Sequence, residues 1–103
     1  PYDRARQTTS MILDALYPLG IPVKESPLLI EQEHETFRDS KHFNEEMLKR
    51  KAFGYYWWRF HRGESVADVY NRVVTFINNI LLTHNNNCDI VVVAHEVVIR
   101  CFI

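Results

Sequence analysis

Apolar residues recur at the period of an α-helix in three parts of the chain, and this pattern predicts most of its elements. In residues 1–16 the apolar side chains gather on one helical face, and Pro18 and Gly20 end the helix. Residues 43–60 predict a second helix that is rich in aromatic residues, with a break allowed at Gly54.

The most regular helical pattern runs from Val66 to Leu81. Ser65 and Asp68 stand at the two positions of a capping box, in which two side chains accept hydrogen bonds from backbone N–H groups of the first turn. His84 and the asparagines at 85–87 close this helix, because asparagine tolerates the left-handed conformation at a helix end. We expect it to be the best-defined element of the chain.

One unbroken run of β-branched residues, Asp89–Ala94, is typical of a buried parallel strand. It leads directly into His95 and a further helical pattern. Residues 21–30 are extended but broken by Pro22 and Pro27, which makes them an edge strand or a strand-like link at best. This succession of strand, turn and helix indicates a layered α/β domain.

The composition narrows the class of protein. The chain has 103 residues, of which 47% are hydrophobic and 24% charged, with a net charge of -1. This suits one small globular domain and offers no basic surface for nucleic acid. No apolar run could span a bilayer, no signal peptide opens the chain, and Cys88 and Cys101 suggest neither a disulfide framework nor a zinc site. We expect a cytoplasmic protein that binds neither nucleic acid nor membrane.

Both ends have the pattern of a truncated domain. The chain opens on Pro1 directly before a helical pattern and stops inside the apolar run 97–103. Native termini usually fade into polar residues. We therefore expect residues 1–103 to form one domain that is incomplete at both ends.

Two segments carry side chains suited to phosphate chemistry. The predicted strand delivers His95 to its carboxyl end, where open α/β sheets bind ligands, although a capped core histidine would show the same pattern. Arg4 and Arg6 stand in the first helical turns, and the arginine fork can donate two hydrogen bonds to one phosphate. Exposed helical arginines are more often solvated surface groups.

Four motifs occur in an order that matches one family. Pro1–Thr8 resembles the second half of a Ser-Pro-x-x-Arg-Ala-x-Gln-Thr signature, and Leu29–Gln32 resembles a Leu-x-Glu-Gln segment. Residues 63–72 resemble a Gly-Glu-Ser-x-x-Asp-Val-x-x-Arg helix start, and Val91–His95 resembles a strand that ends in histidine. Together they resemble the histidine phosphatase, or phosphoglycerate mutase-like, superfamily over essentially the whole chain. The aromatic stretch before residue 63 is most similar to the branch of small broad-specificity phosphatases.

The resemblance implies a fold and a set of roles. The fold would be a three-layer α/β/α sandwich with a mostly parallel sheet. The family's nucleophile is a histidine in an Arg-His-Gly motif, which this sequence does not contain. Arg4 would hold the phosphoryl oxygens, Glu31 would protonate the leaving oxygen, and His95 would donate to the phosphoryl group in the transition state. Substrate contacts are further expected from Glu64, Ser65 and Glu96, with the first two acting primarily in a helix cap.

These roles imply a phosphomonoester phosphatase that forms a phosphohistidine intermediate and acts on a phosphorylated small molecule without metal or other cofactor. Two alternatives remain, a phosphoglycerate mutase-type phosphotransfer and a non-catalytic relative that binds a phosphorylated ligand or a protein. A homo-oligomer is also left open.

Departures from the family pattern support the non-catalytic alternative. Glu96 follows His95 where the family has glycine, and His34 and Glu35 replace an aromatic residue and a glycine. A carboxylate about 4 Å from a bound dianion would repel it by roughly 4 kcal/mol at an effective dielectric constant near 20. If Glu96 faces the phosphate, Glu96→Gly should raise kcat/KM and lower stability by about 1 kcal/mol.

The remaining aromatic residues and histidines have no assigned chemistry. An aromatic cluster could line a substrate pocket or pack as a lid or core; its members are Phe53, Tyr55, Tyr56, Trp57, Trp58 and Phe60. The other histidines lack the spacing of metal ligands; they are His34, His42, His61 and His84.

Overall fold

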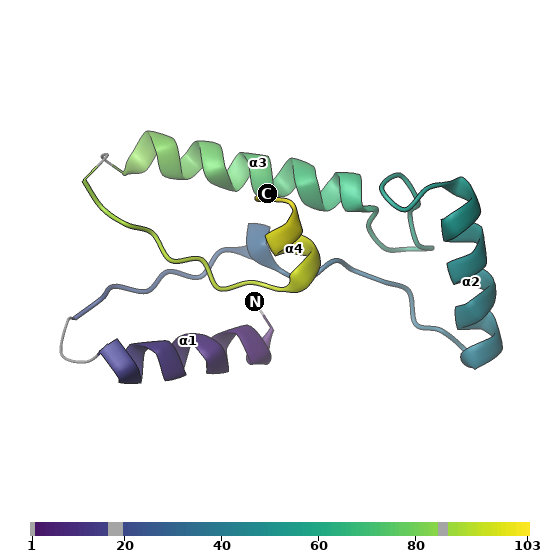
Figure 1. Cartoon of the computed structure of the whole chain (residues 1–103), viewed down its shortest axis with the longest axis horizontal. Coiled ribbons are helices and arrows are strands. Elements are labelled where there is room, and N and C mark those ends of the chain that lie inside the picture. The colour runs from purple at the N-terminus through teal and green to yellow at the C-terminus, as the bar shows by residue number, and fades with distance from the viewer. Residues whose placement is uncertain (1, 17–19, 85–86) are drawn as a thin grey trace.

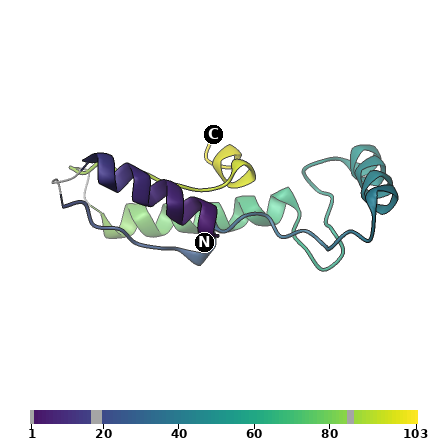
Figure 2. The ribbon, with the colours of Figure 1, turned by 90° about the horizontal axis from the view of Figure 1, so that it is seen from below.

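The computed structural model describes residues 2–16, 20–84 and 87–103. These residues form helices joined by extended segments (Figure 1). In chain order the elements are α1 (Asp3–Leu16), the 3-10 helix η1 (Pro27–Leu29), α2 (Ser40–Phe53), α3 (Val66–Thr83) and α4 (Glu96–Arg100). The molecule is elongated, with extents of 50 × 28 × 19 Å, and α2 lies at one end, apart from the other helices (Figures 1 and 2).

The predicted sandwich with a parallel sheet is wrong for the part of the chain that the structure describes, which contains no β-strand. Residues 89–94 do run extended into His95, but no backbone hydrogen bond joins them to a neighbouring described segment. A strand exists only through hydrogen bonds to its neighbours, so a β-branched run without a partner remains an extended segment. Val91 is accordingly 74% exposed instead of buried.

The predicted helices are largely confirmed. The first runs from Asp3 to Leu16, before the predicted terminators Pro18 and Gly20. Pro1 and Pro18 lie outside the described residues. The aromatic helix is shifted: α2 begins at Ser40, because the Asp39 side chain caps it by accepting from the His42 amide at 2.7 Å.

The α2 helix ends at Phe53, and its C-cap is Gly54, whose φ of 116° is costly for any other residue. Residues 55–60 therefore leave the helix, contrary to the prediction of helix as far as residue 60. The third predicted helix, α3, begins at Val66 behind a complete capping box and ends at Thr83 with His84 as its C-cap. Asn85 and Asn86, which were expected to help close it, lie outside the described residues.

The hydrophobic core lies where α3 meets η1 and α4. Its three buried residues are Val69, Val73 and Val98, and burial of each valine contributes roughly 1.5–3 kcal/mol. Partly buried apolar side chains pack around them, namely Leu29, Ile77, Ala94, Val97 and Cys101. The core thus holds η1 and α4 against one face of α3. Glu31 follows η1 and His95 precedes α4, so this packing positions both residues.

Candidate functional site

Glu31 and His95 lie side by side. Nδ1 of His95 is 3.4 Å from Oε2 of Glu31, and their side chains are only 9% and 21% exposed. The ring of Tyr2 stands edge-on to the imidazole with ring centroids 5.7 Å apart. The other carboxylate oxygen of Glu31 accepts a hydrogen bond from the Gln32 amide at 3.0 Å. The carboxyl group is therefore held in one orientation, toward the histidine.

The second ring nitrogen of His95 is unpaired in the described part of the chain. Nε2 is buried and has no hydrogen-bond partner there. A buried polar group without a partner costs about 1–3 kcal/mol, so an acceptor brought to Nε2 would gain that stabilisation. Nε2 can donate to a bound oxyanion when it carries the ring proton, as it does when a protonated Glu31 donates to Nδ1.

A cavity of about 520 Å³ lies beside this pair. Arg4 and Glu31, two of the predicted catalytic residues, both line it. His95, the third, is not part of the lining, but it contacts two lining residues, Glu31 and Tyr2. Its lining includes, among the described residues, Tyr2, Arg4, Glu31, Gln32, Glu33, His34 and Arg62. The fold therefore brings the three predicted catalytic residues, which are scattered along the chain, into one region.

The two arginines of α1 have different surroundings. Arg6 forms a two-pronged ion pair with Glu25, through N–O distances of 2.8 and 3.0 Å. This hydrogen-bonded pairing raises the pKa of Arg6 and lowers the pKa of Glu25. Arg4 lines the cavity, and its guanidinium has no carboxylate partner among the described residues. Of the two, Arg4 is the arginine that can receive an anion.

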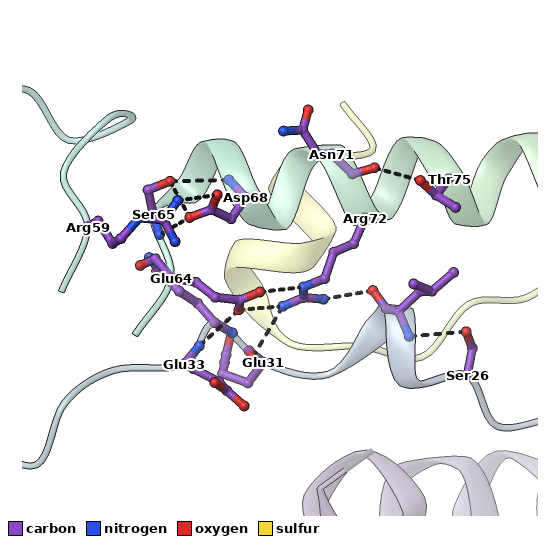
Figure 3. A network of polar contacts seen from close by, with 12 residues as sticks. Ser26, Glu31, Glu33, Arg59, Glu64, Ser65, Asp68, Asn71, Arg72 and Thr75 are labelled. Carbon is purple, nitrogen blue, oxygen red and sulfur yellow. Dashed lines mark hydrogen bonds and ion pairs between the residues drawn. The ribbon is translucent and has the colours of Figure 1, made fainter. Parts of the chain in front are cut away.

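Arg72 ties the Glu31 segment to α3 (Figure 3). Its Nε and Nη2 donate to the two carboxylate oxygens of Glu64, each at 3.0 Å. Nη1 donates to the Leu28 carbonyl at 2.7 Å and Nη2 to the Glu31 carbonyl at 3.3 Å. Glu64 in turn accepts from the Glu33 amide at 3.1 Å. The loop that carries Glu31 is thereby anchored by side chains instead of by its own secondary structure.

Glu64 and Ser65, the two predicted substrate-binding residues before α3, make hydrogen bonds within the protein. Both carboxylate oxygens of Glu64 are engaged by Arg72, and neither residue lines the cavity. Ser65 is 4% exposed and caps α3, where it accepts from the Asp68 amide. Burial opposes ionisation of Asp68, but hydrogen bonds from Ser65 and the nearby Arg59 lower its pKa overall. The substrate-binding roles of Glu64 and Ser65 stay predictions.

Glu96 is likewise not part of the lining of the cavity. Its Oε1 lies 2.6 Å from Nη2 of Arg100, one turn further along α4, and its side chain is 74% exposed. The ion pair neutralises the charge that the sequence places next to His95. A contact of Glu96 with substrate likewise stays a prediction.

Sequence reasoning assigned no role to several residues of the lining, among them Arg62 and Gln32. Arg62 has a φ of 55°, a left-handed conformation that costs a non-glycine residue about 1–3 kcal/mol and is often found at functional sites. Gly63 follows, and a Cβ there would lie 2.5 Å from the Glu33 carbonyl oxygen. The arginine followed by glycine at 62–63 is the signal that the sequence offers for this tight turn.

A second polar cluster joins residues whose spacing along the chain does not suggest a metal site. Potential ligand atoms of Glu35, His42 and Glu46 lie within 4.8 Å of one another. Nδ1 of His42 accepts from the Arg38 amide, and the Lys49 ammonium lies 2.7 Å from Glu46. The Lys49 charge therefore compensates part of the negative charge of this cluster.

The aromatic stretch does not line the cavity, and only Phe60 among its members is buried, whereas Phe53, Tyr55, Tyr56 and Trp57 are exposed. Phe60 is 1% exposed and stands edge-on to His34, with ring centroids 5.2 Å apart. The Arg50 guanidinium stacks over Tyr55 at 3.7 Å and near Phe60 at 5.1 Å. No aromatic residue between Phe53 and Phe60 belongs to the lining among the described residues.

No described helix combines the length and the apolar character that crossing a membrane requires.

Comparison with known proteins adds sequence relatives. The chain is 31% identical to the broad-range acid phosphatase DET1 of Saccharomyces cerevisiae over 87 residues, which cover 79% of this chain and 26% of that protein. It is 29% identical to the phosphoglycerate mutase-like protein AT74 of Arabidopsis thaliana, over all of this chain and 36% of that protein. The related AT74H of the same plant is 28% identical over all of this chain and 40% of its own length.

The chain thus spans between about a quarter and two fifths of the length of these relatives. No solved structure matches it. The family model of the histidine phosphatase superfamily (branch 1) matches residues 1–103. With four motifs in the family's order and this match over its full length, the chain belongs to the histidine phosphatase superfamily.

Proposed function

We propose that the full-length protein is a phosphomonoester phosphatase that acts through a phosphohistidine intermediate. The observation that carries the proposal is the 3.4 Å contact between Glu31 and His95 beside a cavity that Arg4 also lines. A proton donor, an imidazole donor and a guanidinium are the groups that phosphoryl transfer requires when no metal supplies the positive charge. The acid phosphatase among the relatives supports the same chemistry.

The residues would divide the first half of the reaction among them. Arg4 binds two oxygens of the phosphoryl group and orients phosphorus toward the nucleophilic histidine that the family resemblance implies. The N–P bond forms as the P–O bond to the leaving group breaks. Glu31 gives its proton to the leaving oxygen, and Nε2 of His95 donates a hydrogen bond to a phosphoryl oxygen whose charge rises in the transition state.

The second half would use the same groups in reverse. A water molecule attacks phosphorus of the phosphohistidine, and the Glu31 carboxylate takes the proton that the water loses. The N–P bond breaks, inorganic phosphate leaves, and both the histidine and Glu31 return to their starting protonation states. In the mutase alternative, a second hydroxyl group would take the place of the water.

The proposal is tested with the full-length protein and p-nitrophenyl phosphate in the presence of a chelator. We expect hydrolysis to persist without metal, and a short incubation with labelled substrate to leave an acid-labile, base-stable phosphoenzyme, as a phosphohistidine does. A non-catalytic relative would bind phosphate esters and release no phosphate. Activity that disappears with the chelator would contradict the proposal.

A further inference from the structure

Glu31 lies on a loop that has no regular secondary structure to hold it in place. The nearest regular element is η1, which has three residues, and the chain from residue 30 to residue 38 has no helix or strand. A general acid must nevertheless be held to a fraction of an ångström, because misplacement by about 1 Å can lower a rate a hundredfold. Some other part of the molecule must therefore supply the rigidity.

Arg72 meets this need with four hydrogen bonds. It belongs to α3, and its side chain is only 13% exposed. In two of these bonds Arg72 donates to backbone carbonyls, one at Leu28 in η1 and one at Glu31 itself. The other two align the Glu64 carboxylate, which then accepts from the Glu33 amide. The backbone is thus tied directly at Glu31 and, through Glu64, two residues further on.

Gln32 extends the anchoring to the side chain of Glu31. It is 1% exposed, and its Nε2 donates to the Glu64 carbonyl at 2.9 Å. Its backbone amide donates to Oε1 of Glu31 at 3.0 Å, which leaves Oε2 directed at His95. Separate hydrogen bonds therefore link Arg72 to the Glu64 side chain, Gln32 to the Glu64 backbone, and Gln32 to the carboxyl group of Glu31; Figure 3 shows those of Arg72.

We infer that Arg72 is a positioning residue for proton transfer by Glu31, with Glu64 as its partner. The inference rests on the proposed function of Glu31 as the acid. Arg72 does not line the cavity, so it acts on substrate only through the loop. Its effect should then be confined to the step in which the leaving oxygen is protonated.

Substrates with different leaving groups isolate that step. p-Nitrophenolate leaves readily without a proton, whereas an alkoxide leaves only when it is protonated. Arg72→Lys keeps the positive charge and removes the planar fork. We expect it to lower kcat about tenfold or more for an alkyl phosphate and less than about threefold for p-nitrophenyl phosphate, with KM nearly unchanged.

Arg59→Lys is the matched control. Arg59 forms an ion pair at 2.7 Å with Asp68, which lies on α3 as Arg72 does. The Arg59 side chain is 61% exposed, however, and no contact joins it to the Glu31 loop among the described residues. We expect both substrates to be turned over within about twofold of the wild-type rate. Equal losses on both substrates in Arg72→Lys would mean that Arg72 has a general structural role, and would overturn the inference.

Glu31→Gln separates the inference from the function on which it rests. If Glu31→Gln shows no preference for the better leaving group, the acid role of Glu31 fails. If it shows that preference and Arg72→Lys does not, the acid role stands and positioning by Arg72 fails.

Amide hydrogen exchange tests the anchoring without any turnover. We expect the Gln32 and Glu33 amides to exchange about tenfold faster in Arg72→Lys, because both donate within the network, and at the wild-type rate in Arg59→Lys. Unchanged exchange in Arg72→Lys would overturn the inference even if no substrate is turned over.

Discussion

The Glu31 carboxylate lies 3.4 Å from the His95 imidazole because two short elements pack on one helix. η1 and α4 both contact α3, and Val98 of α4 is fully buried against it. The residues flanking these elements therefore meet. Glu31 and His95 lie beside a cavity that is also lined by Arg4, whose guanidinium has no carboxylate partner in the part of the chain that the structure describes. Each of these residues therefore gives its own prediction.

His95→Ala should lower kcat about a hundredfold or more in the full-length protein, because it removes a preorganised donor to the transition state. KM should change far less. His84→Ala, at the exposed end of α3, is the control and should leave kcat unchanged. Initial rates with p-nitrophenyl phosphate measure both variants. Full activity of His95→Ala would contradict the proposed mechanism.

Arg4→Gln and Arg6→Gln form a matched pair on α1. Arg4 lines the cavity, whereas Arg6 is paired with Glu25. Loss of a charge-assisted contact to phosphate is worth about 1.5–3 kcal/mol, so Arg4→Gln should lower kcat/KM roughly tenfold to a hundredfold. Arg6→Gln should leave kcat/KM unchanged, because an exposed ion pair contributes little. Equal losses in the two variants would remove the basis for assigning phosphate to Arg4.

Gly63→Ala should destabilise the protein and disturb the loop beside the cavity. The added Cβ would lie 2.5 Å from the Glu33 carbonyl oxygen, which also accepts from the Glu64 amide at 2.9 Å. Relief of the clash breaks that hydrogen bond, and we expect the free energy of unfolding to fall by about 2 kcal/mol. Denaturant melts measure it. Gly20→Asn is the control, since Gly20 has open space around it and asparagine tolerates its φ of 59°.

Asp68 should make stability depend on pH in the acid range. Burial opposes its ionisation, but the hydrogen bonds from Ser65 and the charge of Arg59 lower its pKa below the ordinary 3.8. A carboxyl with a lowered pKa in the folded state stabilises fully above its unfolded pKa and loses that contribution as the pH falls through the folded pKa.

Asp68→Asn should therefore be less stable than wild type at neutral pH, and the difference should shrink below pH 3.8. Denaturant melts from pH 7 to pH 3 test this. Glu45→Gln, which removes an exposed carboxylate of α2, serves as the control. A difference that stays constant over the whole range would show that the lowered pKa does not stabilise the fold.

Local patterns predicted what local interactions decide. α3 and its Ser65–Asp68 capping box could be predicted because the helical period of apolar residues and the capping residues are both local features of the sequence. The start of α2 was missed, since Asp39 lies in a polar stretch that reads as a loop. The strand predicted at 89–94 was wrong because a strand depends on a partner elsewhere, which periodicity does not reveal.

The candidate site divides in the same way. Arg4, Glu31 and His95 were found through the family's motifs, and the proximity of Glu31 and His95 follows from the packing of η1 and α4 on α3. Arg72 was recognised only as a motif position, because its role depends on hydrogen bonds to Leu28, Glu31 and Glu64, which are visible only in three dimensions.

Glu96 provides the sharpest contrast between sequence and structure. A carboxylate directly after His95 was expected to repel a bound dianion if it faced the phosphate. The side chain is instead 74% exposed, pairs with Arg100 at 2.6 Å, and is not part of the lining of the cavity. Its charge acts on α4, where it stabilises the positive end of the helix dipole and is balanced by an arginine in the last turn.

Two substitutions of Glu96 therefore separate the effect of its charge from the effect of its backbone conformation. Glu96→Gln removes the charge and keeps the side chain, whereas Glu96→Gly also adds chain entropy, so Glu96→Gly should lower stability more, by about 1 kcal/mol in total. With the carboxylate turned to Arg100, we expect kcat/KM for a phosphomonoester to stay within about twofold of wild type in both variants, since an exposed charge is screened by water. Denaturant melts and initial rates on the full-length protein measure the two effects.

An equal rise of kcat/KM in both variants would contradict this expectation and show that the Glu96 charge repels the substrate. A rise in Glu96→Gly alone would point to the backbone at this position, where a glycine would permit closer approach of the phosphate.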